Sequence, residues 1–221
     1  MNLRWKLKVV SRDRMISYDK IEPRWLYRRQ LKSHITAMAI LKIARMGHPV
    51  LRVRAHEVVD PRGPQVLKLV DDMLETMIDA DGRGLAATQV HVPLRVVIFQ
   101  VPPDEDEEKN GSLTILVNPS IEKLTKEVEY DWEACLSVPE LIGLVPRCPK
   151  IRYHGTTPVG VKVDCIAEGF HARVVQHECD HLDGFLYPQR MDDMSLLLFR
   201  EEMRNGIPDE ARRLMEDVDA E

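Results

Sequence analysis

The chain has 221 residues, of which 44% are hydrophobic and 30% charged, and its formal net charge is −5; this suits one domain with a sizeable core. No run of about eighteen or more apolar residues occurs, and Arg4, Lys6 and Lys8 interrupt the N-terminal stretch, so neither a membrane span nor a secretory signal is expected. The four cysteines form no CxxC pair, which argues against a disulfide-stapled secreted protein and favours the cytoplasm.

The N-terminal extension, residues 1–37, differs in charge from the rest of the chain. It carries ten Lys or Arg against three acidic residues, whereas residues 38–221 carry 21 against 33. Such an extension could be an organellar targeting segment, an arm that touches RNA, or the translation of a region upstream of Met38, and the last is favoured. We expect a compact domain over 38–205 and a polar acidic tail over 206–221.

The first predicted elements of that domain lie between residues 39 and 99. Residues 39–54 are expected to form an extended arm or a short turn. From residue 64 onward, apolar residues recur at three- and four-residue spacing until an Asp-Gly pair, which predicts an amphipathic helix over 64–80. The β-branched run at 95–99 predicts a strand.

The second half is expected to combine short strands with two helices. The acidic stretch 102–112 is interpreted as a solvated loop without function. Short β-prone segments separated by Pro, Gly and Asn predict antiparallel strands at 113–117, 127–130, 151–153 and 160–167. Helices are expected at 170–182 and 192–205. The predicted fold class is therefore α+β, with small antiparallel or mixed sheets around a central helix and a C-terminal helix.

Residues 177–181 read His-Glu-Cys-Asp-His, an HExxH pattern inside the predicted helix 170–182. Histidines four residues apart project from one face of a helix, so both imidazoles can bind one metal ion. Glu178 can then reach a water molecule beside that ion. This pattern alone arises by chance in about one or a few chains in a hundred of this length, so further motifs must decide.

A catalytic metal site of this kind needs a third protein donor. No histidine follows His181. Glu201 and Glu202 are possible donors on a following helix, as in thermolysin-like enzymes. Cys135 is the better candidate, because its thiolate is a stronger and more negative ligand.

Three motifs together resemble the peptide deformylase family, bacterial type. They are GRGLAATQ at 82–89, EACLSVP at 133–139 and QHECDHLDG at 176–184. The segment RMGHPVL, close after Met38, is also similar to the N-terminal part of that family. The resemblance implies that residues 38–205 form a catalytic domain, which hydrolyses the N-formyl group from the N-terminal formylmethionine of nascent polypeptides and releases formate.

The resemblance also implies a metal centre with a base beside it. Cys135, His177 and His181 are implied as the ligands of one divalent metal ion, Fe2+ in the cell, with Zn2+, Ni2+ or Co2+ as substitutes. Glu178 is implied as the general base toward the attacking water and then as the acid toward the departing amine. The thiolate ligand predicts a centre that is sensitive to oxidation by air.

On the substrate side, the resemblance implies an oxyanion hole and a close approach of the peptide backbone. Gln89, through its side-chain amide, and Leu136, through its backbone N–H, are implied as the oxyanion donors. Gly84 is implied to let the substrate backbone approach. Ile142 is expected to contact the substrate, and Leu141 and Val174 are further candidates for the methionine pocket. The expected partners are formylmethionyl nascent peptides and, transiently, the ribosome, with no membrane and no nucleic acid bound by the catalytic domain.

Three positions depart from the family pattern. Ala134 stands where the second motif usually has glycine, Thr88 where the first usually has proline, and Ile142 where many relatives carry arginine. If the glycine adopts a positive φ, alanine is expected to distort the site, so lower activity or an altered substrate preference is a prediction. Family likeness also implies an ion pair between Glu133 and Arg147.

Two alternative functions remain open at the level of sequence. A different HExxH metallohydrolase, such as a peptidase, would cleave internal peptide bonds. A weakly active deformylase-like paralogue would bind nascent chains or ribosomes without releasing formate.

Overall fold

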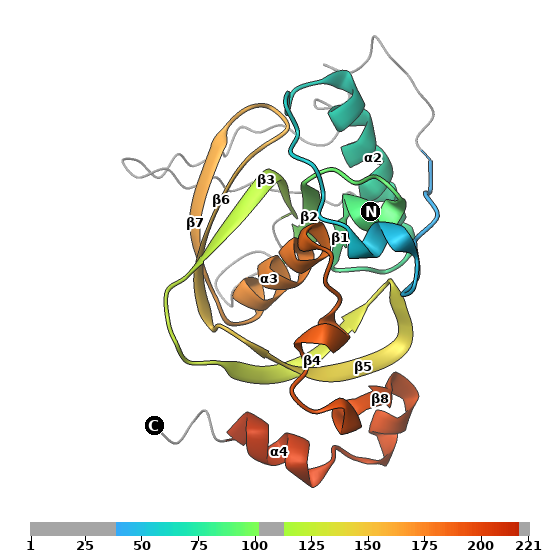
Figure 1. The fold of residues 1–221 in the computed structure, drawn as a ribbon, viewed down its shortest axis with the longest axis vertical. Helices are drawn as coiled ribbons and strands as arrows, with labels where there is room; N and C mark the ends of the chain where they lie inside the picture. Colours follow the sequence, from blue (N-terminus) through green and yellow to red (C-terminus); the bar gives the residue numbers. More distant parts are fainter. Residues whose placement is uncertain (1–38, 102–112, 217–221) are drawn as a thin grey trace, which may run out of the picture.

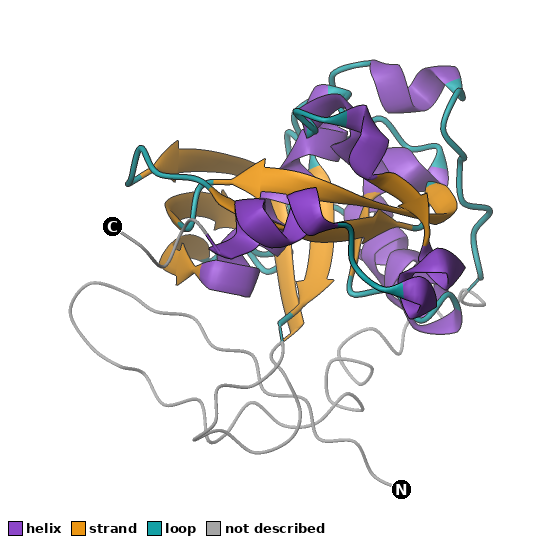
Figure 2. Ribbon diagram, turned by 90° about the horizontal axis from the view of Figure 1, so that it is seen from below, coloured by secondary structure: helices purple, strands orange, loops and turns teal. Residues whose placement is uncertain are grey.

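The computed structural model describes residues 39–101 and 113–216. The basic extension 1–37 and the acidic stretch 102–112 therefore lie outside the described residues. Figure 2 shows strands running through the middle of the molecule with helical segments around them. In the part of the chain described here, no helix combines the length and the apolar character that crossing a membrane needs.

A five-stranded sheet with the strand order β1-β2-β3-β6-β7 forms the larger part of the fold. Neighbouring strands pair antiparallel throughout. The β-branched run predicted near residues 95–99 becomes a central strand, in which Val96, Val97, Ile98 and Phe99 are fully buried. The strands are β1 (Gly84–Ala86), β2 (Val96–Gln100), β3 (Leu113–Lys123), β6 (Lys150–Thr156) and β7 (Lys162–Glu168).

A second sheet has three antiparallel strands in the order β4-β5-β8. Its strands are β4 (Glu129–Cys135), β5 (Val138–Arg147) and β8 (Leu197–Phe199). The second motif forms the turn between β4 and β5, so Cys135 ends one strand and Val138 begins the next. The prediction of an α+β fold with small antiparallel sheets is confirmed, although β3 and β5, with 11 and 10 residues, are longer than the short segments expected.

Two long helices pack against the sheets, close to where the apolar periodicity predicted them. Helix α2 (Pro64–Asp79) begins with a proline, which suits the first helical turn. Helix α3 (Gly169–Asp183) lies between the five-stranded sheet and the β4–β5 hairpin (Figure 1). It ends at Gly184, whose φ is 86°. A Cβ there would lie 2.9 Å from the Arg52 carbonyl carbon, so glycine satisfies both the conformation and the close contact.

The prediction of a helix over 192–205 is wrong. The structure instead has the 3₁₀ turn η4 (Met194–Leu196), strand β8, and the 3₁₀ helix η5 (Arg200–Asn205). The apolar run in this segment pairs with the free edge of β5, and this tertiary pairing overrides the local helical pattern. The C-terminal helix is α4 (Asp209–Glu216), within the segment expected as a polar tail, and its Ala211 is buried beside Leu144 and Leu196.

Candidate metal centre

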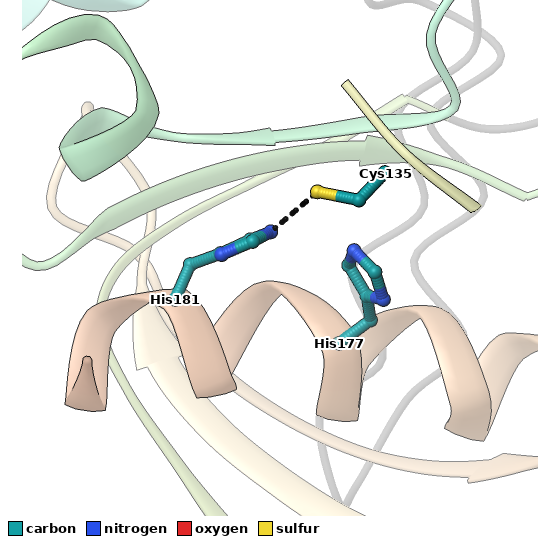
Figure 3. Close-up of side chains that lie close together, drawn as sticks. All are labelled: Cys135, His177 and His181. Carbon is teal, nitrogen blue, oxygen red and sulfur yellow. Dashed lines mark hydrogen bonds between the residues drawn. The ribbon is translucent and has the colours of Figure 1, made fainter. Parts of the chain in front are cut away.

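Three side chains from two distant parts of the sequence meet between β4 and α3. Cys135 ends β4, and His177 and His181 lie one turn apart on the same face of α3 (Figure 3). One ligand atom from each residue lies within 4.8 Å of the other two. The Cys135 Sγ is 3.3 Å from the His181 Nε2. The structure thus brings together the three residues that the sequence predicted as ligands.

A buried carboxylate fixes the orientation of the first histidine. The His177 Nδ1 donates to the Glu133 Oε2 at 2.8 Å, which leaves the Nε2 free to bind a metal ion. Although burial alone would raise the pKa of Glu133, hydrogen bonds from Arg147 and His177 hold it well below its usual range. Glu133 therefore remains ionised behind the ligand.

Two arginines hold this carboxylate in turn. Arg147 donates to both Glu133 oxygens, at 2.8 and 2.9 Å, so the ion pair expected from family likeness is confirmed. Arg173 donates to the Glu133 Oε1 at 3.0 Å and to the Val145 carbonyl at 2.7 Å. Sequence analysis missed Arg173, although it lies one helical turn before His177 on α3 and this spacing could have revealed it.

Glu178 is buried beside the three candidate ligands, and one of its carboxylate oxygens is unpaired among the described residues. Its side chain is 4% exposed, and its Oε2 has no hydrogen-bond partner among the described residues. Burial raises the pKa of Glu178 to about 7, with His177 opposing and Glu133 adding to the shift. Such a carboxyl group can accept and return a proton near neutral pH.

Gly84 lies directly against Glu178. A Cβ on Gly84 would overlap the Glu178 Oε1 and would lie 2.6 Å from its Cδ. The glycine predicted for a close approach of the substrate backbone thus has a second role, because only a residue without a side chain leaves room for the carboxyl group.

Gln89 presents its side-chain amide toward the same centre. Its Oε1 accepts a hydrogen bond from the Ala86 N–H at 2.9 Å. Its Nε2 then faces the Cys135 Sγ at 3.5 Å and donates to the Ser137 Oγ at 3.1 Å. Ser137 was not singled out from the sequence, although it belongs to the second motif. The N–H donors of Gln89 are therefore preoriented at the metal centre.

These groups line one cavity of about 900 Å³. It contains Cys135, His177, Glu178, Gln89 and Gly84, together with Leu136, Leu141 and Val174. Ile142 is not among the lining residues, whereas the four residues before it in β5, from Val138 to Leu141, all line the cavity. This geometry does not support the expected contact between Ile142 and the substrate.

The two departures nearest the ligands fit the fold. Among the described residues, Ala134 is not one that adopts a positive φ, so alanine does not strain the backbone beside Cys135. Thr88 is fully buried and its Oγ1 donates to the His181 carbonyl at 3.2 Å. A proline could not make this hydrogen bond between the first motif and α3.

The donor set fits a metal ion. One sulfur and two imidazole nitrogens suit Zn2+, Fe2+ and similar ions, and three protein ligands leave a position open. Among the described residues, the Nδ1 of His181, a member of this cluster, is buried without a hydrogen-bond partner, as is the Oε2 of Glu178, the residue next to His177. The fold and the site together define the class of small α+β metal-dependent hydrolases with an HExxH helix.

Comparisons with known proteins identify the family within this class. Residues 40–196 match the family described as polypeptide deformylase. A peptide deformylase 1 of Nitrosomonas europaea is 45% identical over 70% of this chain and 89% of its own length. One from Bordetella pertussis is 50% identical over 69% and 88%. The chain belongs to the polypeptide deformylase family.

Solved structures agree with this assignment. A class I type b peptide deformylase from Acinetobacter baumannii with Met-Ala-Ser bound aligns with a TM-score of 0.63 and 34% identity, over 69% of this chain and 99% of that one. A peptide deformylase from Ehrlichia chaffeensis aligns with a TM-score of 0.65 and 29% identity, over 82% and 96%. The protein is thus a hydrolase that removes the N-formyl group from nascent peptides, which decides against the peptidase alternative.

Proposed function

We propose that deformylation takes place in the cavity beside α3, with Cys135, His177 and His181 as the ligands of one divalent metal ion. The observation that carries this proposal is that these donors lie within 4.8 Å of one another, and that two of them, Cys135 and His177, line one cavity together with Glu178. When bound, a divalent ion lowers the pKa of a water molecule and polarises a carbonyl oxygen. The remaining steps belong to side chains and backbone groups of this chain.

Glu178 is the general base and then the general acid. Its raised pKa, about 7, suits a group that takes a proton from the attacking water and returns it to the departing amine. Glu133 keeps His177 oriented through the Nδ1 hydrogen bond of 2.8 Å and is itself held by Arg147 and Arg173. His177 is thus oriented before the substrate arrives.

Gln89 and Leu136 stabilise the negative charge that develops on the formyl oxygen. The Gln89 amide accepts from the Ala86 N–H and donates one N–H to the Ser137 Oγ, and its Nε2 also faces the Cys135 Sγ at 3.5 Å. The backbone N–H of Leu136, in the turn after Cys135, supplies the second donor. Loss of one such donor typically lowers kcat by about a hundred- to a thousandfold. The peptide backbone approaches along the main chain of Gly84, whose missing side chain also leaves room for the Glu178 carboxyl group.

The metal in the cell is proposed to be Fe2+, with Zn2+, Ni2+ or Co2+ as substitutes. The mixed sulfur and nitrogen donor set is compatible with all four ions. The Cys135 thiolate makes the iron form prone to oxidation, since thiolates are the reactive form of cysteine.

The enzyme is proposed to act in the cytoplasm, where it contacts the ribosome briefly as formylated chains emerge. All four cysteines are free thiols, which supports this compartment.

Formate release from formyl-Met-Ala-Ser tests this proposal with Fe2+- and Zn2+-loaded protein. We expect turnover by the wild type and a loss of about a hundredfold or more in Glu178→Gln, because the general base is removed while the ligands remain. Metal content should stay unchanged. Glu210→Gln on the exposed α4 is the matched control and should keep full activity. No formate from the loaded wild type would contradict deformylation, and an active Glu178→Gln would contradict the role of Glu178.

A further inference from the structure

The wall of the catalytic cavity includes residues from beyond the part of the chain that matches the family. The family match covers residues 40–196. Phe199, Arg200 and Glu201, which follow it in β8 and η5, nevertheless line the same cavity as Cys135 and His177. This C-terminal segment therefore adds surface to the active site that the three family motifs do not provide.

Strand pairing explains how Phe199 reaches the cavity. Strand β8 pairs antiparallel with β5, and Phe199 is directly opposite Leu141. Side chains of directly opposed residues in antiparallel strands lie on the same face of the sheet, about 5 Å apart at Cβ. Because Leu141 lines the cavity, Phe199 extends the same apolar wall outward by one strand.

The exposed fraction of the lining residues increases from the deep end of the cavity to its mouth. Glu178 is 4% exposed, Leu141 is half-buried, and Phe199 is 54% exposed. Another aromatic lining residue, Phe170, is 47% exposed. A formyl group at the buried ligands therefore places the next residues of the peptide at a mouth with exposed aromatic side chains.

We propose that Phe199 is a specificity-determining residue, which favours substrates with an apolar side chain at one of the two positions after the formylmethionine. This inference rests on the proposed function, because the direction of the bound peptide follows from the position of the formyl group at the ligands. The ring has open surface to bury, and the free energy of burying apolar area is favourable. Contact with a small polar side chain would bury much less of this surface.

The test compares kcat/KM for three peptides, formyl-Met-Ala-Ser, formyl-Met-Leu-Ser and formyl-Met-Ala-Leu, in the metal-loaded wild type and in Phe199→Ala. We expect the wild type to prefer at least one leucine peptide. Phe199→Ala should reduce that preference by about fivefold or more, since one apolar contact in a pocket discriminates on this scale. Phe199 is more than half exposed, so the variant should fold normally, as a thermal melt can verify.

Leu198→Ala is the matched control, because Leu198 is the neighbouring residue of β8, opposite Ile142, and does not line the cavity. It should leave the peptide preference unchanged. An unchanged preference in Phe199→Ala, or an equal fall for all three peptides, would overturn the specificity role while deformylation stands. Absence of formate from every peptide with the wild type would overturn the proposed function and this inference with it.

Discussion

Gly84 and Glu178 share a space that has no room for one more carbon atom. A Cβ at position 84 would lie 2.6 Å from the Glu178 Cδ, so Gly84→Ala must displace the carboxyl group. Displacement of a catalytic group by about 1 Å can reduce the rate by about a hundredfold. We therefore expect kcat/KM for formate release to fall by about that factor, while metal analysis shows full occupancy.

Gly155→Ala is the matched control for this prediction. Gly155 lies in β6, where an added Cβ would meet the Leu116 Cδ2 at 3.3 Å, away from the residues that line the cavity. This variant should keep its activity. If Gly84→Ala turned over formylated peptide as fast as Gly155→Ala, the steric relation between Gly84 and Glu178 would be wrong.

The sequence indicated the central site residues but not all of the cavity wall. The proximity of Cys135, His177 and His181 was predictable because a ligand pattern and two companion motifs restrict these positions chemically. Ile142 was expected to contact the substrate and does not line the cavity, because the direction of a strand residue depends on pairing that the sequence does not state. Phe199 was missed for the same reason: no motif surrounds it, and only the pairing of β8 with β5 brings it to the site.

Between elements, a buried charge cluster connects β4 and β5 to α3. Glu133 of β4 is 5% exposed and pairs with Arg147 of β5 and with Arg173 of α3. Glu133→Gln would take the nearest carboxylate away from the buried Arg173, which has Asp131 only at 4.0 Å. It would also take one of two carboxylates away from Arg147, which keeps its ion pair with Asp180. Breaking a buried pair in this way costs about 3–5 kcal/mol. We expect a loss of this size in the free energy of unfolding, measured by urea denaturation in the presence of a chelator.

Asp164→Asn provides the comparison for that prediction. Asp164 of β7 pairs with Arg152 of β6, and both side chains are partly exposed, so solvent screens the interaction. Its removal should change the unfolding free energy far less than Glu133→Gln does. Equal losses of unfolding free energy in the two variants would contradict the prediction that burial makes the Glu133 ion pairs contribute more to stability than the exposed pair does.

The reliability of the predicted elements follows the strength of their patterns. Helix α2 was predicted as 64–80 and forms over Pro64–Asp79, because a long apolar periodicity and a proline at its start agree. Helix α3 was predicted equally closely. The prediction at 192–205 was wrong because a short apolar run is compatible with both a strand and a helix. In the structure, pairing with the free edge of β5 makes this run a strand.

At the scale of the molecule, the proposed metal centre joins two parts of the fold. Cys135 belongs to the three-stranded sheet, whereas His177 and His181 belong to α3, which packs on the five-stranded sheet. An ion bound by all three residues binds the folded chain and not the unfolded one, so it stabilises the fold. At a free concentration a thousand times its Kd, this stabilisation is about 4 kcal/mol.

Removal of the metal should therefore lower the Tm of the protein by several degrees, and restoring Zn2+ should reverse the change. The measurement is a thermal melt followed by circular dichroism with and without a chelator. Cys135→Ala, which lacks one ligand, should respond much less to the chelator, whereas Cys165→Ala, a change of a half-exposed thiol in β7, should respond as fully as the wild type. Metal analysis should confirm that the chelator has removed the ion. If the Tm of the wild type were then unchanged, the prediction that a bound ion stabilises the fold by linking β4 to α3 would be contradicted. An equal response of the two cysteine variants would place the bound metal away from Cys135.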